Sequence, residues 1–169
     1  VLERNISPDE LIISSTNIQE HALVGTVIGA LMTTDLNTGE TFTYTLVSGT
    51  GDTDNASFEI IGDELRTREV FDYEIKNSYS IRARTTDSGG LFIDKAFTIT
   101  VTDVNELPSF NVIQEQQINE DAGPYSVPLT GIASGDDVSQ PVRIVATSSN
   151  TSLIPNPTAT YTSPDATGS

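Results

Sequence analysis

Apolar and polar residues alternate along several short stretches of the chain. In 97–102, Phe, Ile and Val take the odd positions and Thr takes every even position. In 79–84, Tyr, Ile and Ala alternate with Ser and two Arg residues. Successive side chains of a strand point to opposite faces, so this pattern is typical of strands with one packed face and one wet face.

Other apolar stretches are short and divided by turn residues. Further strands are expected at 11–15, 24–32, 41–47, 58–61 and 64–69, with turns at 37–39, 48–55 and 87–90. No segment keeps apolar residues at helical spacing for three turns. About seven strands in about 100 residues predict an all-β chain, folded as a Greek-key β-sandwich of two sheets.

The alternation is interrupted at Val104–Pro108, and a new pattern begins at Asn111. The chain has 169 residues, enough for one sandwich and a shorter remainder. We therefore expect one domain at 5–107 and an incomplete second β-sandwich unit at 108–169. Glu-His-Ala at 20–22 and Glu-Asp-Ala at 120–122 repeat each other weakly, which favours repeated units.

The charge balance restricts the partners. Eight Lys and Arg against 24 Asp and Glu give a net charge of −16, which opposes binding to nucleic acid or to an anionic membrane surface. The chain has no Cys, so thiolate metal sites and disulfides are excluded. No apolar run approaches the roughly 20 residues of a membrane span, and we expect no membrane insertion. Acidic oxygens are the ligands of hard divalent cations, although such a charge also serves solubility alone.

Four acids are expected at one end of the first domain. Asp72 and Glu74 are two residues apart, hence on one side of an extended segment and about 7 Å apart. Asp103 continues the inward row of 97–101 beyond its end, and Glu20 lies at a strand junction. Together with the carbonyls that follow Asp103, these carboxylates would suit calcium, which accepts six to eight oxygen ligands.

Residues Asn5 to Pro108 resemble a cadherin repeat of the bacterial secreted kind. The resemblance covers nearly two thirds of the chain and rests on five motifs in the family's order. They are Glu20-His21-Ala22, Asp35-Leu36-Asn37, Phe71-Asp72-Tyr73-Glu74, Thr86-Asp87-Ser88-Gly89-Gly90 and Asp103-Val104-Asn105-Glu106.

This resemblance implies calcium half-sites at the two poles of the domain. The C-terminal pole would use Glu20, Asp72, Glu74, Asp103, Asn105 and Glu106, with Asp136 and Asp137 of the following unit. The N-terminal pole would use Asp35, Asn37 and Asp87. Arg4 opposes a cation at this second pole, which we expect to be weak or empty.

Several positions depart from the family pattern and leave the number of ions open. His21 stands where the family has Asn, Asn37 where it has Asp, and Glu106-Leu107 where animal repeats have Asp-Asn. His21 is expected at the surface, because calcium disfavours imidazole. Gly51–Asn55 loosely resembles a calcium loop, but no Glu closes it at the twelfth position, so we interpret it as a polar turn.

Residues from about Asn111 resemble the opening strands of a second bacterial immunoglobulin-like repeat. The matching pieces are Ile118–Gly123, Thr130–Gly135 and Thr147–Asn150. Further strands would be needed to cover its edges. We expect this unit to be marginally stable alone and to pair with another copy.

The resulting hypothesis is a calcium-rigidified spacer and cell-adhesion repeat of a larger secreted or cell-surface protein, and not an enzyme. Its partners would be neighbouring repeats, with homophilic or other protein adhesion left open. The alternative is a carbohydrate-binding or passive structural module of a secreted polysaccharide-processing protein. A polysaccharide site favours exposed aromatic rings, but the chain has no Trp, and Tyr125 and Tyr161 are the conceivable contacts. Enzymatic chemistry would depend on the spacing of Asp72 and Glu74 alone, because there is one His and no Cys.

Overall fold

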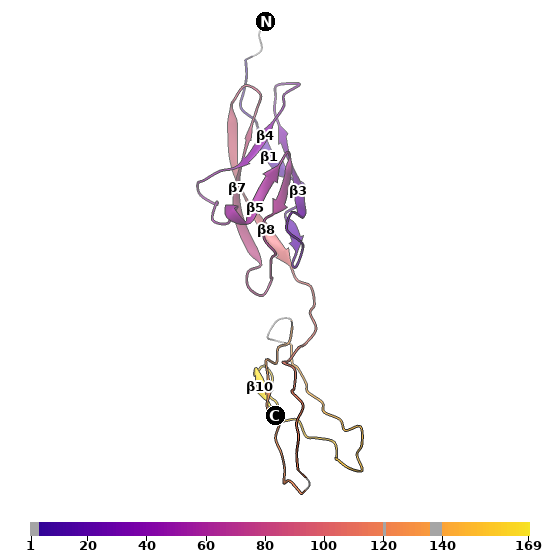
Figure 1. The fold of residues 1–169 in the computed structure, drawn as a ribbon. Helices are drawn as coiled ribbons and strands as arrows, with labels where there is room; N and C mark the ends of the chain where they lie inside the picture. The colour runs from indigo at the N-terminus through magenta and orange to yellow at the C-terminus, as the bar shows by residue number, and fades with distance from the viewer. Residues whose placement is uncertain (1–3, 120, 136–139) are drawn as a thin grey trace. The chain divides into compact units, whose positions relative to one another are not determined.

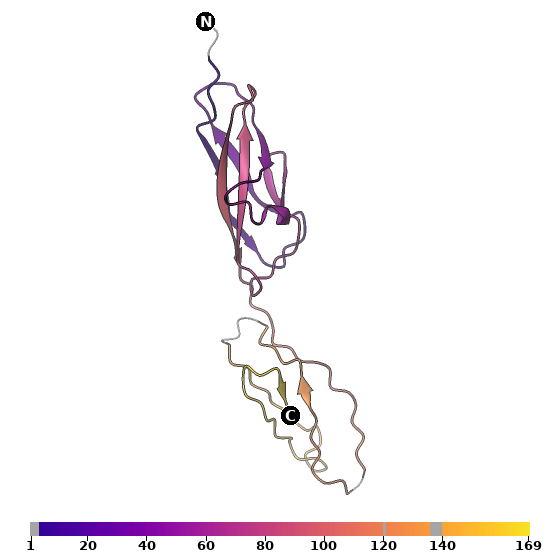
Figure 2. The ribbon, with the colours of Figure 1, turned by 90° about the vertical axis from the view of Figure 1, so that its left-hand side faces the viewer.

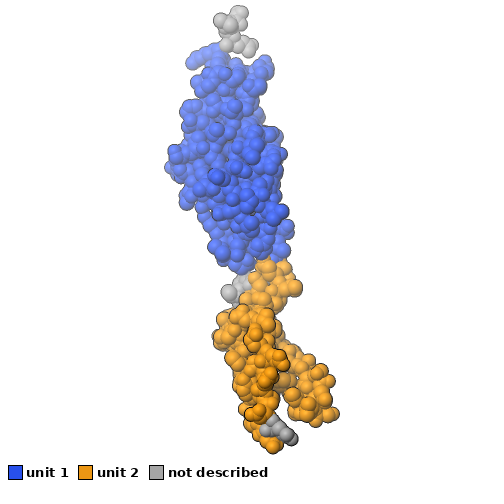
Figure 3. Space-filling view, viewed as in Figure 1, with its two compact units in different colours: residues 1–104 blue, residues 105–169 orange. Residues whose placement is uncertain are grey.

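Eight strands form two four-stranded sheets in the first part of the chain (Figure 1). The computed structural model describes residues 4–119, 121–135 and 140–169. It divides into two units, 1–104 and 105–169, coloured separately in Figure 3. The described residues contain no helix with the length and apolar character needed to cross a bilayer.

The strands of both sheets run along the length of the first unit (Figures 1 and 2). One sheet has the order β1-β3-β6-β5, and the other has the order β2-β8-β7-β4. Neighbours pair antiparallel except β2 and β8, which are parallel. The bounds are β1 Glu10–Ile13, β2 Asn17–Gln19, β3 Val27–Thr34, β4 Thr43–Leu46, β5 Phe58–Ile61, β6 Glu64–Thr67, β7 Ser78–Thr86 and β8 Phe92–Thr102, with a 3-10 turn η1 at Asn55–Ser57.

The N-terminal segment passes from one sheet to the other at Ser14–Thr16. Ser14 N still donates to Ala30 O of β3 at 2.9 Å, whereas Thr16 O accepts from Thr100 N of β8 at 2.8 Å. Gly29 makes the crossing possible, because a Cβ at this position would lie 2.5 Å from Ser15 O. The close approach of two backbones therefore requires glycine here.

Alternating residues fill the space between the sheets. Tyr79, Ile81 and Ala83 of β7 are buried, and Ile99 and Val101 of β8 are fully buried. The intervening Arg82 and Arg84 lie on the outer face, where both contact Asp94. The predicted inward and outward faces of these two strands are confirmed.

The all-β sandwich expected from the sequence is confirmed, with differences in strand number and length. Eight strands replace the seven expected, because the N-terminal segment is split into β1 and β2. The strand β8 begins five residues earlier than the alternation from Phe97 indicated, at Phe92. In its first half, residues on both faces are partly buried, so buried and exposed residues do not alternate there and the start of the strand was not predicted.

The second unit has little regular structure in the residues that the structure describes. Its strands are β9 Leu129–Thr130 and β10 Thr167–Gly168, an antiparallel pair, and Ser109 forms an isolated bridge with Ala133. Among its described residues, Ile132 is the one buried hydrophobic side chain. Exposed ones include Phe110, Val112, Tyr125, Val145 and Leu153. A core of this size contributes little stability.

Candidate metal centre

A trio of aromatic rings positions the loop that carries Asp72 and Glu74. The Phe71 side chain is buried, with its ring centroid 4.5 Å from that of Tyr79 and 5.3 Å from that of Phe58. The residues after Phe71 form a tight turn, in which Tyr73 still packs against the core. Asp72 closes this turn by accepting hydrogen bonds from Ile75 N at its Oδ1 and from Lys76 N at its carbonyl, both at 3.0 Å.

Glu20 is a buried carboxylate that joins three segments. Its residue is 2% exposed, and it follows β2 directly. The Oε2 atom accepts from Tyr73 N at 2.8 Å, and Oε1 accepts from Val104 N at 2.6 Å. Each carboxylate oxygen has two lone pairs, so these bonds leave acceptor capacity for a cation.

The carboxylates of Glu20, Asp72 and Glu74 converge. Each offers an oxygen, and these oxygens all lie within 4.8 Å of one another. Two ligands on opposite sides of a calcium ion, each at 2.3–2.6 Å, are about 5 Å apart, so one ion can contact the whole set. The spacing and the all-oxygen donor set therefore fit calcium.

The negative charge of this cluster affects the pKa of Glu74, whose side chain is exposed. Partial removal from water raises the pKa of Glu74 most, and the negative charges of Glu20, Asp103 and Asp72 raise it further. Asp103 follows the last residue of β8 and is exposed at this end of the unit. The other three acids that the sequence analysis expected at this pole thus act on Glu74, and this repulsion favours a cation.

The other residues predicted for this pole stay predictions. Asn105 and Glu106 belong to the second unit. Asp136 and Asp137 lie outside the described residues. His21 is exposed, as expected, and its φ of 57° lies in the left-handed region, where the chain turns after Glu20.

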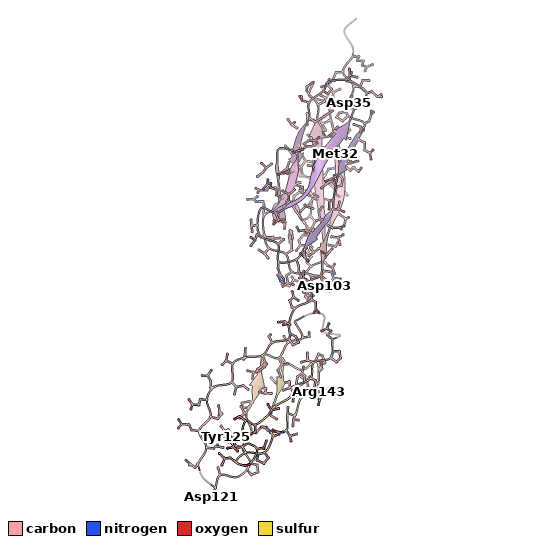
Figure 4. All side chains as sticks on the ribbon, turned by 90° about the vertical axis from the view of Figure 1, so that its right-hand side faces the viewer. Met32, Asp35, Asp103, Asp121, Tyr125 and Arg143 are labelled. Atoms are coloured by element: carbon pink, nitrogen blue, oxygen red, sulfur yellow. The ribbon has the colours of Figure 1, made fainter. Side chains whose placement is uncertain are left out.

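The N-terminal pole lies at the opposite end of the first unit, as Asp35 and Asp103 show in Figure 4. Asp35 Oδ1 accepts from Asn37 N at 2.8 Å, and the Asn37 side chain accepts from Ile6 N and donates to Arg4 O. Asp87 is 5% exposed and accepts from Asn5 Nδ2 at 3.2 Å and Leu91 N at 2.8 Å. The predicted residues are thus tied to the segment 4–6.

Sequence reasoning missed Asn5 as a member of this pole. Its Oδ1 atom and Asp35 Oδ2 are buried and accept no hydrogen bond from the residues that the structure describes. The segments 4–8 and 104–108 each contain Asn three residues before Pro, at Asn5 and Asn105. This repeated spacing is the sequence signal that could have indicated Asn5.

Asp54 and Lys76 were also missed, although both adjoin the acidic cluster. Asp54 forms an ion pair with Lys76 through Oδ1 and accepts from Ser80 N at 2.7 Å through Oδ2. Asn55 likewise uses both side-chain atoms, on Val47 O and Arg82 N. The loop 51–55 is therefore held on β7 as a structural turn, as predicted. The four-residue spacing of Asp72 and Lys76 was a signal for Lys76, but it predicts a pair with Asp72 and does not indicate Asp54.

The comparisons with known proteins concern the fold. No protein-family model matches the chain. The structure is similar to human protocadherin-24 EC1-2, with a TM-score of 0.50 and 18% identity, covering 64% of this chain and 50% of that one. It is also similar to the protocadherin gammaB7 EC3-6 cis-dimer structure (TM-score 0.49, 23% identity, 77% and 33% covered). A third is the protocadherin GammaB4 extracellular domain (TM-score 0.46, 26% identity, 76% and 21% covered).

These solved chains are longer than this one, which spans half of the protocadherin-24 chain and about a third or less of the other two. The likeness to protocadherin-24 shows that the chain has the β-sandwich fold of cadherin domains. At such identities, the likeness establishes the fold alone.

Proposed function

We propose that the first unit binds calcium at its C-terminal pole. Glu20, Asp72 and Glu74 would be direct ligands, with Asp103 beside them. The observation that carries the proposal is the convergence of three carboxylate oxygens within 4.8 Å around the buried Glu20. Without an ion, the like charges destabilise this pole, and an ion that binds the folded state stabilises it by mass action.

This unit would serve as a cadherin-like repeat of a larger secreted or cell-surface protein of the bacterial kind. Asn105, Glu106, Asp136 and Asp137 would complete the site from the following repeat, so that calcium stiffens the connection between repeats. Asp35, Asn37 and Asp87 would form a weaker half-site towards a preceding repeat. The role is that of a spacer and adhesion module, without enzymatic activity, and its partners are neighbouring repeats or other surface proteins.

Calorimetric melting of the full chain in excess EDTA and in millimolar calcium tests the proposal. Calcium at about 100 times its dissociation constant stabilises the folded state by about 2.7 kcal/mol. For a domain of about 100 residues, this corresponds to a rise in Tm of roughly 10–20 °C. The variants Asp72→Asn and Asp103→Asn should reduce that rise.

Glu59→Gln is the matched control, because Glu59 lies on β5 and outside the cluster. It should leave the calcium-dependent difference in Tm unchanged. An equal Tm of the wild-type chain in EDTA and in calcium would contradict the proposal and would favour a passive spacer.

A further inference from the structure

Lys76 is the basic residue that follows the acidic cluster most closely in the turn. Its backbone N–H donates to Asp72 O at 3.0 Å, and it lies four residues after Asp72 and two after Glu74. Side chains four residues apart on one helical turn are neighbours. A flexible lysine in this position would ordinarily pair with the nearby carboxylates.

The structure instead shows the Lys76 ammonium on Asp54, twenty-two residues away in sequence. Its Nζ also lies 4.5 Å from the centroid of the Tyr79 ring, a distance typical of a cation–π contact. Lys76 is thus held by a carboxylate and by an aromatic face.

Asp54 is a rigid anchor for this ammonium. Its side chain is 13% exposed, and Oδ2 accepts from Ser80 N of β7 at 2.7 Å. Burial alone would raise the pKa of Asp54, but the hydrogen bonds from Lys76 and Ser80 lower it overall. Asp54 is therefore a fixed negative charge on the sheet.

Asp54 and one member of the acidic cluster, Asp72, share a hollow. Asp54, Asp72, Lys76 and Tyr79 line one open hollow of about 340 Å³. Burial raises the pKa of Tyr79 most, and the negative charges of Glu69, Asp54 and Asp72 raise it further. Glu69 lines the same hollow. The hollow therefore offers a Lys76 side chain released from Asp54 two other acids, Glu69 and Asp72, of which Asp72 belongs to the acidic cluster.

We propose that Asp54 is a positioning residue that holds Lys76 away from Asp72 and Glu74 and so keeps the acidic pole available to a divalent cation. Lys76 is a tethered competitor for that site, and the Asp54–Tyr79 pair decides where its charge lies. This inference rests on the proposed calcium site.

Asp54→Asn is the informative substitution, because the amide oxygen still accepts from Ser80 N while the charge is lost. Lys76 should then move to the acidic cluster and weaken calcium binding about two- to fivefold, as expected for an exposed charge pair. Lys76→Gln alone should bind calcium as tightly as the wild-type chain or slightly more tightly. The double variant should recover wild-type affinity.

Two measurements on the full chain decide the inference. Isothermal titration gives the calcium dissociation constants, and NMR in EDTA gives the cross-peaks between the Lys76 side chain and the Tyr79 ring. Asp94→Asn is the control, since Asp94 is held by Arg82 and Arg84 on the outer face and should not alter calcium affinity. Cross-peaks lost in Asp54→Asn, with affinity recovered in the double variant, support the positioning role.

Two results overturn the inference. One is an Asp54→Asn chain that keeps both the Lys76–Tyr79 cross-peaks and wild-type affinity. The other is a double variant that binds as weakly as Asp54→Asn. A wild-type chain that takes up no calcium contradicts the proposed function instead. The spectra in EDTA then still decide whether Asp54 positions Lys76.

Discussion

Replacing Glu20 by Gln should destabilise the first unit even when no calcium is present. The substitution conserves shape but leaves one acceptor oxygen where the carboxylate has two. Tyr73 N and Val104 N both donate to Glu20 in the native chain, at 2.8 and 2.6 Å. In Glu20→Gln, one of these buried N–H groups must face an NH2 group.

Two opposing effects set the magnitude. A buried donor left without an acceptor costs about 1–3 kcal/mol, and the remaining bond changes from charge-assisted to neutral, which costs about 1 kcal/mol more. Removing one charge also relieves repulsion from Asp72 and Glu74, which contributes about 1 kcal/mol in salt-screened water. The net loss is about 1–3 kcal/mol, or roughly 5–20 °C in Tm for a domain of this size.

The assay is calorimetric or circular-dichroism melting of the full chain in excess EDTA at neutral pH. Asp72→Asn is the matched comparison, because its amide oxygen still accepts from Ile75 N while it loses a charge from the same cluster. It should melt at or above the wild-type temperature in EDTA. If Glu20→Gln also melts at or above that temperature, repulsion outweighs the hydrogen bonds, and Glu20 does not act as a structural clamp.

Three further predictions concern the acids, the core and the N-terminal pole. Glu74→Gln should raise Tm in EDTA at pH 7. The folded-state pKa of Glu74 is raised, so the ionised carboxylate destabilises the folded chain, and the gain should vanish as the pH falls below the ordinary Glu value of 4.5; a gain that persists at low pH would contradict this reason. Phe71→Ala should lower the free energy of unfolding by about 3–5 kcal/mol and weaken calcium binding, because it removes the ring that supports the Asp72 turn. An unchanged calcium affinity in titration would show that the Phe71 ring does not position the site. Gly89→Ala should displace Asn5, whose Nδ2 would lie 2.0 Å from the new Cβ, and should speed hydrogen exchange at Ile6 N. Gly123→Ala is the control, because its new Cβ meets nothing within 4 Å, and it should leave this exchange unchanged. Equal protection of Ile6 N in the wild-type chain and both variants would refute the docking of residues 4–6.

Local alternation was sufficient to predict the fold class and the faces of β7. Successive side chains of a strand point to opposite faces, so the sequence alone assigns Tyr79, Ile81 and Ala83 to one face, and these residues are buried. The strand β2 could not be found this way. It has three residues, and its partner β8 lies about eighty residues further along the chain, so its existence depends on tertiary pairing.

The acidic pole was partly predictable for a similar reason. Spacing predicted Asp72 and Glu74 on one side of an extended segment, and parity predicted Asp103 just beyond the inward row of 97–101. The structure instead holds Asp72 and Glu74 in a tight turn, closed by hydrogen bonds to Asp72, and this turn brings them close to Glu20. The position of Lys76 depends on a choice between Asp54 and nearer acids, and local sequence favours the nearer ones. Burial of Asp54 against β7 reverses that preference, and this information exists only in the folded chain.

The parallel pairing of β2 with β8 has a mechanical consequence. One strand lies near the start of the first unit and the other at its end, and they run side by side in the same direction. Tension between residues 4 and 104 therefore pulls the two strands past each other along their length. Their hydrogen bonds are loaded together in shear instead of opening one after another, and Glu20 adds a side-chain bond to Val104 at the loaded end. The first unit is therefore expected to resist extension when its two ends are pulled apart.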